Sequence, residues 1–176
     1  MEKSRVLKIG VIGPESTGKT SLCESLARHY ETAWVPEYAR EYFERADIHN
    51  YSPNDLEIIA LKQMQNQEKM EKEADTFLFC DTTLITLKIW SELEFEMVPD
   101  LIAANLKNEK FDHYFITDNQ LPWVEDELRL NKFDRDMILE MNINEVKNLK
   151  KEFTLIEGRK SERTEKAFKS LDSLFS

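Results

Sequence analysis

The stretch Gly13–Thr20, with the sequence GPESTGKT, matches in full the pattern G-x-x-x-x-G-K-[ST] of a phosphate-binding loop. Gly13 and Gly18 allow the backbone to bend until successive N–H groups face a common centre, where a phosphate can bind. Lys19 is expected to reach the β- and γ-phosphates of ATP, and Thr20 to offer its hydroxyl to Mg²⁺. The predicted nucleotide contacts are Gly13, Pro14, Glu15, Ser16, Thr17, Gly18, Lys19, Thr20 and Ser21.

The surroundings of this loop favour a real nucleotide site over a chance match. Residues 6–12 form a short apolar run, typical of a buried strand, that leads directly into Gly13. The residues after the loop have an apolar face at helical spacing, made by Leu22, Leu26, Ala27 and Tyr30. Only 4 glycines occur in the chain, and Gly13 and Gly18 stand at the positions that the loop requires.

Apolar runs and helical patterns alternate along the whole chain. Strands are predicted at residues 6–12, 32–35, 76–80, 113–117 and 153–156, with helices at 20–30, 37–46, 53–72, 84–94, 100–107, 134–150 and 161–175. This alternation predicts an α/β fold: a three-layer α/β/α P-loop kinase fold with a five-stranded parallel sheet. One domain is expected over residues 1–176, with a small lid at about 118–135. Because such sheets bind ligands at the carboxyl ends of their strands, one crevice should gather Gly13, Glu37, Asp81, Asp118 and Gly158.

The charge balance restricts the possible partners. Lys and Arg number 24 against 34 Asp and Glu, giving a net charge of −10. A basic stripe is missing from the sequence, so nucleic acid and anionic membranes are not expected as partners, and a small-molecule substrate is. No apolar run approaches the roughly 20 residues of a membrane span. With two cysteines that form no disulfide framework and no signal-peptide pattern, a cytoplasmic protein is expected; the oligomeric state stays open.

Other classes of P-loop protein fit the sequence less well. Asn131–Asp134 reads N-K-x-D, the guanine-reading motif of GTPases, but a charged stretch precedes it where a buried strand should stand. The switch motif D-x-x-G does not occur in the sequence. A motor-type ATPase would usually need a larger core. The short chain and the acids that follow the second predicted strand are more typical of a small-molecule kinase.

Five stretches taken in order resemble the ribosylnicotinamide kinase domain of the NadR type. They are GPESTGKT, EYARE (Glu37–Glu41), ALKQ with Gln63, FLFCDTTLITLKIW (Phe77–Trp90) and WVEDELR (Trp123–Arg129). The resemblance implies transfer of a phosphoryl group from ATP·Mg to the 5′-hydroxyl of nicotinamide riboside. The sequence has no counterpart of the DNA-binding and adenylyltransferase parts of full-length regulators, and Glu127 stands where the lid usually has Gly. Another nucleoside kinase and a non-catalytic ATP-binding regulator remain alternatives.

Acidic residues near two strand ends are the candidate catalytic groups, together with Lys19. Asp81 ends an apolar strand and is expected to hold Mg²⁺, although Asp is also a good helix N-cap. Glu37 follows the second strand and could accept the proton of the substrate hydroxyl, or simply stabilise the start of a helix. Arg40, one turn further on, could bind substrate or pair with Glu37. Tyr38 is a further expected substrate contact.

The remaining candidates lie in the predicted lid and after the last strand. Trp123 is either a core residue or, as the resemblance implies, stacks on the nicotinamide ring, with Asp126 beside it. Arg129 and Arg135 are each either a lid residue that neutralises charge on the transferred phosphoryl group or an exposed surface arginine. As in related kinases, the loop that contains Gly158 and Arg163 is expected to pack on adenine.

Overall fold

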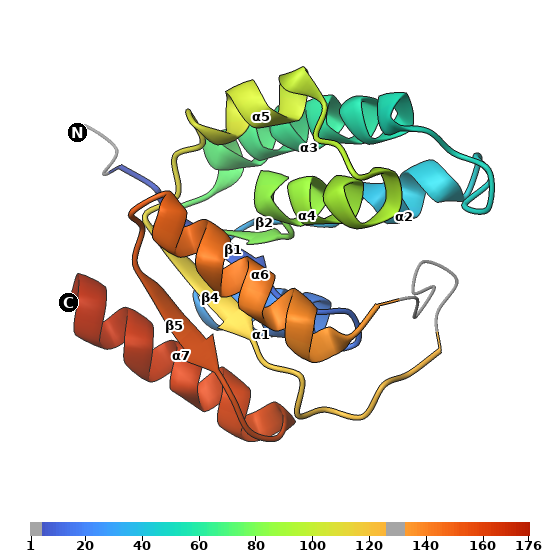
Figure 1. The fold of residues 1–176 in the computed structure, drawn as a ribbon. Helices are drawn as coiled ribbons and strands as arrows, with labels where there is room; N and C mark the ends of the chain where they lie inside the picture. Colours follow the sequence, from blue (N-terminus) through green and yellow to red (C-terminus); the bar gives the residue numbers. More distant parts are fainter. Residues whose placement is uncertain (1–4, 126–132) are drawn as a thin grey trace.

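A parallel five-stranded sheet forms the centre of the computed structural model, which describes residues 5–125 and 133–176 (Figure 1). Its strand order is β2-β3-β1-β4-β5, and every neighbouring pair is parallel. The strands are β1 (Leu7–Ile12), β2 (Trp34–Val35), β3 (Phe77–Asp81), β4 (His113–Thr117) and β5 (Phe153–Ile156). The expected α/β class and the five-stranded parallel sheet are therefore confirmed.

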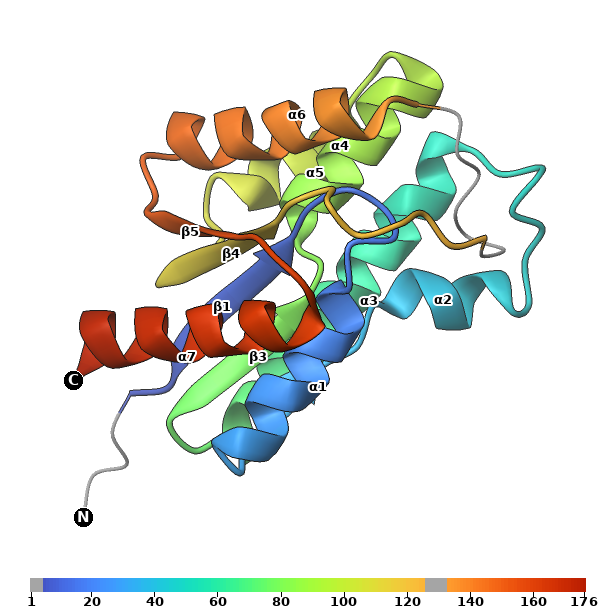
Figure 2. The same ribbon diagram turned by 90° about the horizontal axis from the view of Figure 1, so that it is seen from below.

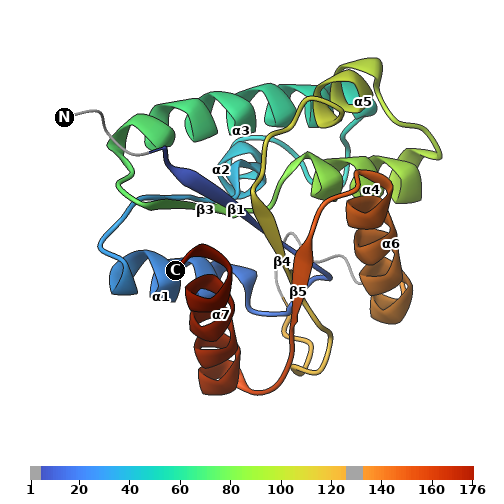
Figure 3. The ribbon, with the colours of Figure 1, turned by 90° about the vertical axis from the view of Figure 1, so that its left-hand side faces the viewer.

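Helices cover both faces of the sheet, as Figure 3 shows. They are α1 (Lys19–His29), α2 (Tyr38–Phe43), α3 (Pro53–Glu73), α4 (Leu84–Phe95), α5 (Asp100–Leu106), α6 (Arg135–Asn148) and α7 (Lys160–Phe175). Helices α1 and α7 share one hydrophobic cluster with the sheet, and the other helices supply the cluster on the opposite face. The expected three layers are therefore present. No helix in the described parts of the chain is long and apolar enough to cross a bilayer.

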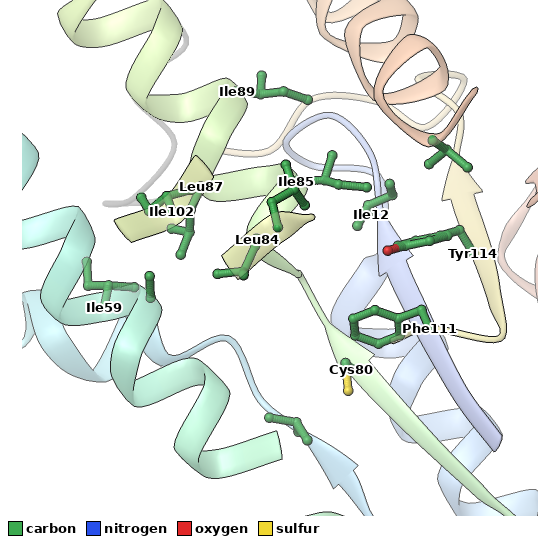
Figure 4. Close-up of a cluster of buried hydrophobic side chains, with 14 of the residues drawn as sticks. Ile12, Ile59, Cys80, Leu84, Ile85, Leu87, Ile89, Ile102, Phe111 and Tyr114 are labelled. Atoms are coloured by element: carbon green, nitrogen blue, oxygen red, sulfur yellow. The ribbon is translucent and has the colours of Figure 1, made fainter. Parts of the chain in front are cut away.

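The alternation of side chains along the central strands places the acidic residue of β3. In β3, Phe77 and Phe79 pack toward α1 and α7, while Leu78 and Cys80 belong to the opposite cluster, part of which is drawn in Figure 4. Because successive residues of a strand point to opposite faces, Asp81 falls on the α1 side at the carboxyl end of the strand. That end of the sheet also carries the β1–α1 loop, seen at one end of β1 in Figure 2.

A local sequence signal accounts for the start of α3, and two other boundaries differ from the prediction. Ser52 and Asp55 form the expected capping box at the start of α3. Strand β2 is shorter than predicted: the backbone N–H of Thr32 donates to the Ala27 carbonyl at 3.0 Å instead of to a neighbouring strand. Helix α2 ends at Phe43 instead of continuing to residue 46.

Gly10→Ala should destabilise the fold by about 1–3 kcal/mol, the usual cost of overpacking a core. A Cβ at Gly10 in β1 would lie 2.8 Å from the ring of Tyr114 and 2.9 Å from Cγ2 of Thr83. Urea denaturation of the two proteins measures the difference. Adding Thr83→Ser removes that methyl group and keeps the hydroxyl that caps α4, so the double variant should recover part of the loss. Equal stability of wild type and Gly10→Ala would contradict the close packing.

Candidate active site

The phosphate-binding loop bends sharply where it approaches the end of β4. Gly13 has φ +142° and Gly18 has φ +78°, both in the region that favours glycine. A Cβ on Gly13 would lie 2.4 Å from Oγ1 and 2.5 Å from the carbonyl oxygen of Thr117, so only glycine fits there. The Thr17 hydroxyl donates to the Pro14 carbonyl at 2.7 Å and lies 2.6 Å from Oγ1 of Thr117. The loop is therefore held both by its own bonds and by β4.

Two side chains at the start of α1 have the chemistry of an ATP·Mg site. Nζ of Lys19 donates to the carbonyls of Gly13 (3.1 Å) and Pro14 (2.7 Å), so the ammonium group lies over the loop. Oγ1 of Thr20 donates to Oδ2 of Asp81 at 2.5 Å. The positive end of the helix dipole adds to the attraction for an anion at this point.

Asp81, the predicted magnesium ligand, is a buried carboxylate next to the hydroxyl of Thr20. It is 1% exposed, and its Oδ1 has no hydrogen-bond partner among the described residues. Burial, followed by the negative charge of Glu37, raises the pKa of Asp81 to about 6. A buried carboxylate with an unused oxygen, next to a threonine hydroxyl and a second acid, has the donor atoms that Mg²⁺ prefers. The residues therefore fit the metal.

Glu37 is held in place by its neighbours in sequence and by α3. Its Oε2 lies 3.3 Å from Nε of Arg40, one of the two alternatives expected for that arginine. The buried side chain of Gln63 contacts the backbone on both sides of Glu37. Its Oε1 accepts from the Tyr38 amide at 2.9 Å, and its Nε2 donates to the Pro36 carbonyl at 3.3 Å. Gln63 therefore fixes the backbone that carries the candidate base.

One cavity of about 180 Å³ joins the phosphate-binding loop to Glu37 and Arg40, whereas Asp81 lies behind Thr20 and is not among the lining residues. The loop contributes Gly13, Glu15, Ser16, Thr17, Gly18, Lys19, Thr20 and Ser21, and α2 and the residue before it contribute Glu37 and Arg40. The other lining residues come from α4, from α6 and from the residues just before α6: Thr86, Ile89, Trp90, Leu93, Glu94, Phe133, Arg135, Ile138 and Asn142. Sequence reasoning assigned no role to these residues apart from Arg135.

Arg135 lies beside the loop at the first residue of α6. Its Nη1 donates to the Glu15 carbonyl at 3.3 Å, and its Nη2 donates to the carbonyls of Asn119 (2.9 Å) and Leu121 (2.8 Å). The guanidinium group therefore connects the phosphate-binding loop to the chain that follows β4. It lines the cavity and is not the exposed arginine that the sequence left possible.

Arg163 is buried between Asp118 and the phosphate-binding loop. Its side chain is 4% exposed and forms an ion pair with Asp118. It also donates to the carbonyls of Gly158 (2.8 Å) and Thr17 (3.2 Å), which ties α7 to the phosphate-binding loop. With these contacts, the guanidinium group stabilises the phosphate-binding loop through the Thr17 carbonyl. Direct contact of Gly158 and Arg163 with adenine stays a prediction, and neither residue lines the cavity.

The predicted substrate contacts are only partly brought together. Tyr38 and Trp123 are half-buried, and neither lines the cavity. Asp126 and Arg129 lie outside the described residues. In place of Trp123, the cavity wall contains Trp90, whose Nε1 donates to the hydroxyl of Tyr51 at 2.6 Å. The sequence contains one sign of this wall: Thr86, Ile89, Trp90 and Leu93 recur at the spacing that places residues on one face of a helix.

Comparison with known proteins identifies relatives in sequence. The trifunctional NAD biosynthesis/regulator protein NadR of Salmonella typhimurium is 29% identical over 127 residues, covering 70% of this chain and 31% of that protein. NadR of Escherichia coli is 28% identical over 127 residues, with the same coverage. The chain thus spans about a third of the length of these curated relatives.

Solved structures share the fold. NadR protein in complex with NR superposes with a TM-score of 0.81 at 19% identity, over 96% of this chain and 50% of that one. Deoxyadenosine kinase from M. mycoides gives 0.60 at 16% identity, over 96% of this chain and 100% of that one.

These matches confirm the expected resemblance to NadR-type kinases in sequence and in fold. The family model described as "AAA domain" matches residues 8–163, which is most of the chain. The chain therefore belongs to this AAA-domain family of P-loop proteins.

Proposed function

We propose that the chain transfers the γ-phosphoryl group of ATP to the 5′-hydroxyl of nicotinamide riboside, giving nicotinamide mononucleotide. The observation that carries this proposal is a cavity lined jointly by the phosphate-binding loop, Glu37, Arg40 and the side chain of Trp90. NadR proteins have been solved with NR and with NAD and AMP-PNP, which supports ligands of this kind for a related domain.

The cavity offers a separate surface for each part of the two substrates. The loop amides and Lys19 would bind the β- and γ-phosphates, and Arg135 would add positive charge beside them. Trp90 presents an aromatic wall suited to a flat cationic pyridinium ring, since a cation over an indole face is attracted to it. Phe43 and Tyr51 support that indole, with ring centroids 5.9 and 5.8 Å from it.

Phosphoryl transfer needs positioning and charge neutralisation more than covalent chemistry. Glu37, oriented by Gln63 and Arg40, would accept the proton of the 5′-hydroxyl as that oxygen attacks the γ-phosphorus. Thr20 and Asp81 would hold Mg²⁺, which when bound neutralises charge on the β- and γ-phosphates. The leaving ADP oxygen stays within reach of Lys19 and the loop amides.

A panel of ribonucleosides with ATP·Mg tests the proposal, with ADP release and product mass as readouts. Nicotinamide riboside should give ADP and nicotinamide mononucleotide in equal amounts. Turnover with other nucleosides and none with nicotinamide riboside would overturn the acceptor and favour another nucleoside kinase. ATP binding without ADP release for any acceptor would favour a non-catalytic regulator.

Glu37→Gln should lower kcat by about 10²–10⁴-fold, the usual contribution of a general base, and leave the Kd for ATP within a few-fold of wild type. Steady-state kinetics and equilibrium ATP binding give the two numbers. Glu41→Gln is the matched control, because Glu41 is exposed on the same helix and does not line the cavity. Equal losses of rate and ATP affinity in Glu37→Gln would argue for a structural role.

Gln63→Leu should lower kcat about tenfold while ATP affinity is unchanged. The substitution removes the two hydrogen bonds that fix the backbone around Glu37, and the poorer orientation of Glu37 should raise the activation free energy by about 1–2 kcal/mol. Gln67→Leu is the control, since Gln67 is buried one turn further along α3 with its Nε2 unpartnered among the described residues. Gln63→Glu keeps the acceptor for Tyr38 and should retain more activity than Gln63→Leu. A stability loss in Gln63→Leu with full kcat would contradict the positioning role.

A further inference from the structure

The wall formed by α4 and α6 contains two buried polar atoms that find no hydrogen-bond partner within the described parts of the chain. The two helices pack against each other and are joined by an ion pair between Lys88 and Glu145. Their cavity-lining residues recur at helical spacing, which makes one continuous wall: Thr86, Ile89, Trp90, Leu93 and Glu94 on α4, and Arg135, Ile138 and Asn142 on α6.

Asn142 has the more informative of these atoms. The residue is 2% exposed, and its Nδ2 donates to the Ile138 carbonyl at 2.8 Å. That bond fixes the orientation of the amide and leaves Oδ1 as an acceptor, which has no partner within residues 5–125 and 133–176. The hydroxyl of Thr86 is likewise buried and unpartnered in the described chain. Buried polar atoms are rarely left unpaired, so these two point to a ligand in the cavity.

The hydrogen-bonding capacities of Oδ1 of Asn142 and of the Thr86 hydroxyl indicate which ligand group could bond to both. Oδ1 of Asn142 can only accept, so the ligand must donate a hydrogen there, while the Thr86 hydroxyl can donate or accept. A carboxamide on an aromatic ring offers both functions: its NH₂ donates and its carbonyl accepts. An ionised carboxylate has no hydrogen to donate and would set two negative oxygens against Oδ1.

We propose that Asn142, with Thr86, binds the carboxamide of the pyridine base and makes the site select the amide over the acid form. The inference rests on the proposed function, because it says which residues bind the base of the nicotinamide riboside that the proposed reaction phosphorylates. The apolar side chains Ile89, Trp90 and Ile138 would enclose the ring between this polar pair and the ribose. Since an unpaired buried acceptor costs about 1–3 kcal/mol, selectivity of about 10–100-fold is expected.

The test compares kcat/KM for nicotinamide riboside and nicotinic acid riboside with ATP·Mg. Wild type should prefer the amide by about 10–100-fold, and Asn142→Leu should bring the ratio close to one, mainly by losing the amide. Asn142→Asp keeps the size of the side chain and adds a charge that repels the acid, so its ratio should exceed that of wild type. Thr86→Val should lower the ratio less than Asn142→Leu does.

Ser91→Ala is the matched control, because Ser91 lies on α4 with a buried, unpartnered hydroxyl in the described structure but does not line the cavity. Its ratio should equal that of wild type. Nicotinamide riboside binding without ATP, followed by Trp fluorescence, should weaken about 10–100-fold in Asn142→Leu independently of the chemical step.

The outcomes separate this inference from the proposed function. If wild type phosphorylates nicotinamide riboside and neither Asn142 variant changes the ratio, the carboxamide assignment is overturned and the function stands. If wild type phosphorylates neither pyridine nucleoside but accepts another nucleoside, the proposed function fails, and this inference fails with it.

Discussion

The site depends on the contact between the phosphate-binding loop and the end of β4. Gly13 lies so close to Thr117 that no side chain fits between them, and Thr17 bonds the same threonine. Arg163 holds the Thr17 carbonyl from behind while it pairs with Asp118 in a buried environment. A buried ion pair adds little net stability but fixes geometry, since removing one partner would leave an uncompensated charge. The loop shape is thus imposed by residues far apart in sequence.

Much of this arrangement could be predicted from the sequence, because it depends on short-range patterns. Strand β1, the glycines of the loop and the start of α1 lie within about 20 residues, and their order alone indicates a P-loop. Asp81 could be placed because β3 is apolar up to its last residue, and the carboxyl ends of parallel strands meet at one edge. The capping box at Ser52 is equally local.

The missed features depend on long-range packing. From the sequence, Trp123 and Trp90 could equally well provide an aromatic wall for the substrate. In the structure Trp90 lines the cavity, on the helix α4 that packs against α6. A buried Arg163 is contrary to the usual exposure of arginine, and it is explained by Asp118, which is 45 residues away. Asn142 looks like an ordinary polar residue of an amphipathic helix, because nothing in the sequence shows that its Oδ1 lacks a partner.

The electrostatics of the site explain how an acidic protein can bind an anionic nucleotide. The chain carries a net charge of −10, yet the loop amides, Lys19 and Arg135 supply positive potential at one point. The acids Glu37 and Asp81 adjoin this point, and their mutual repulsion contributes to the raised pKa of Asp81. A nucleotide that brings its own divalent cation relieves that repulsion, whereas a bare triphosphate adds to it. Under the proposed function, the pairing of acids with the loop would therefore favour ATP as its magnesium complex over free ATP.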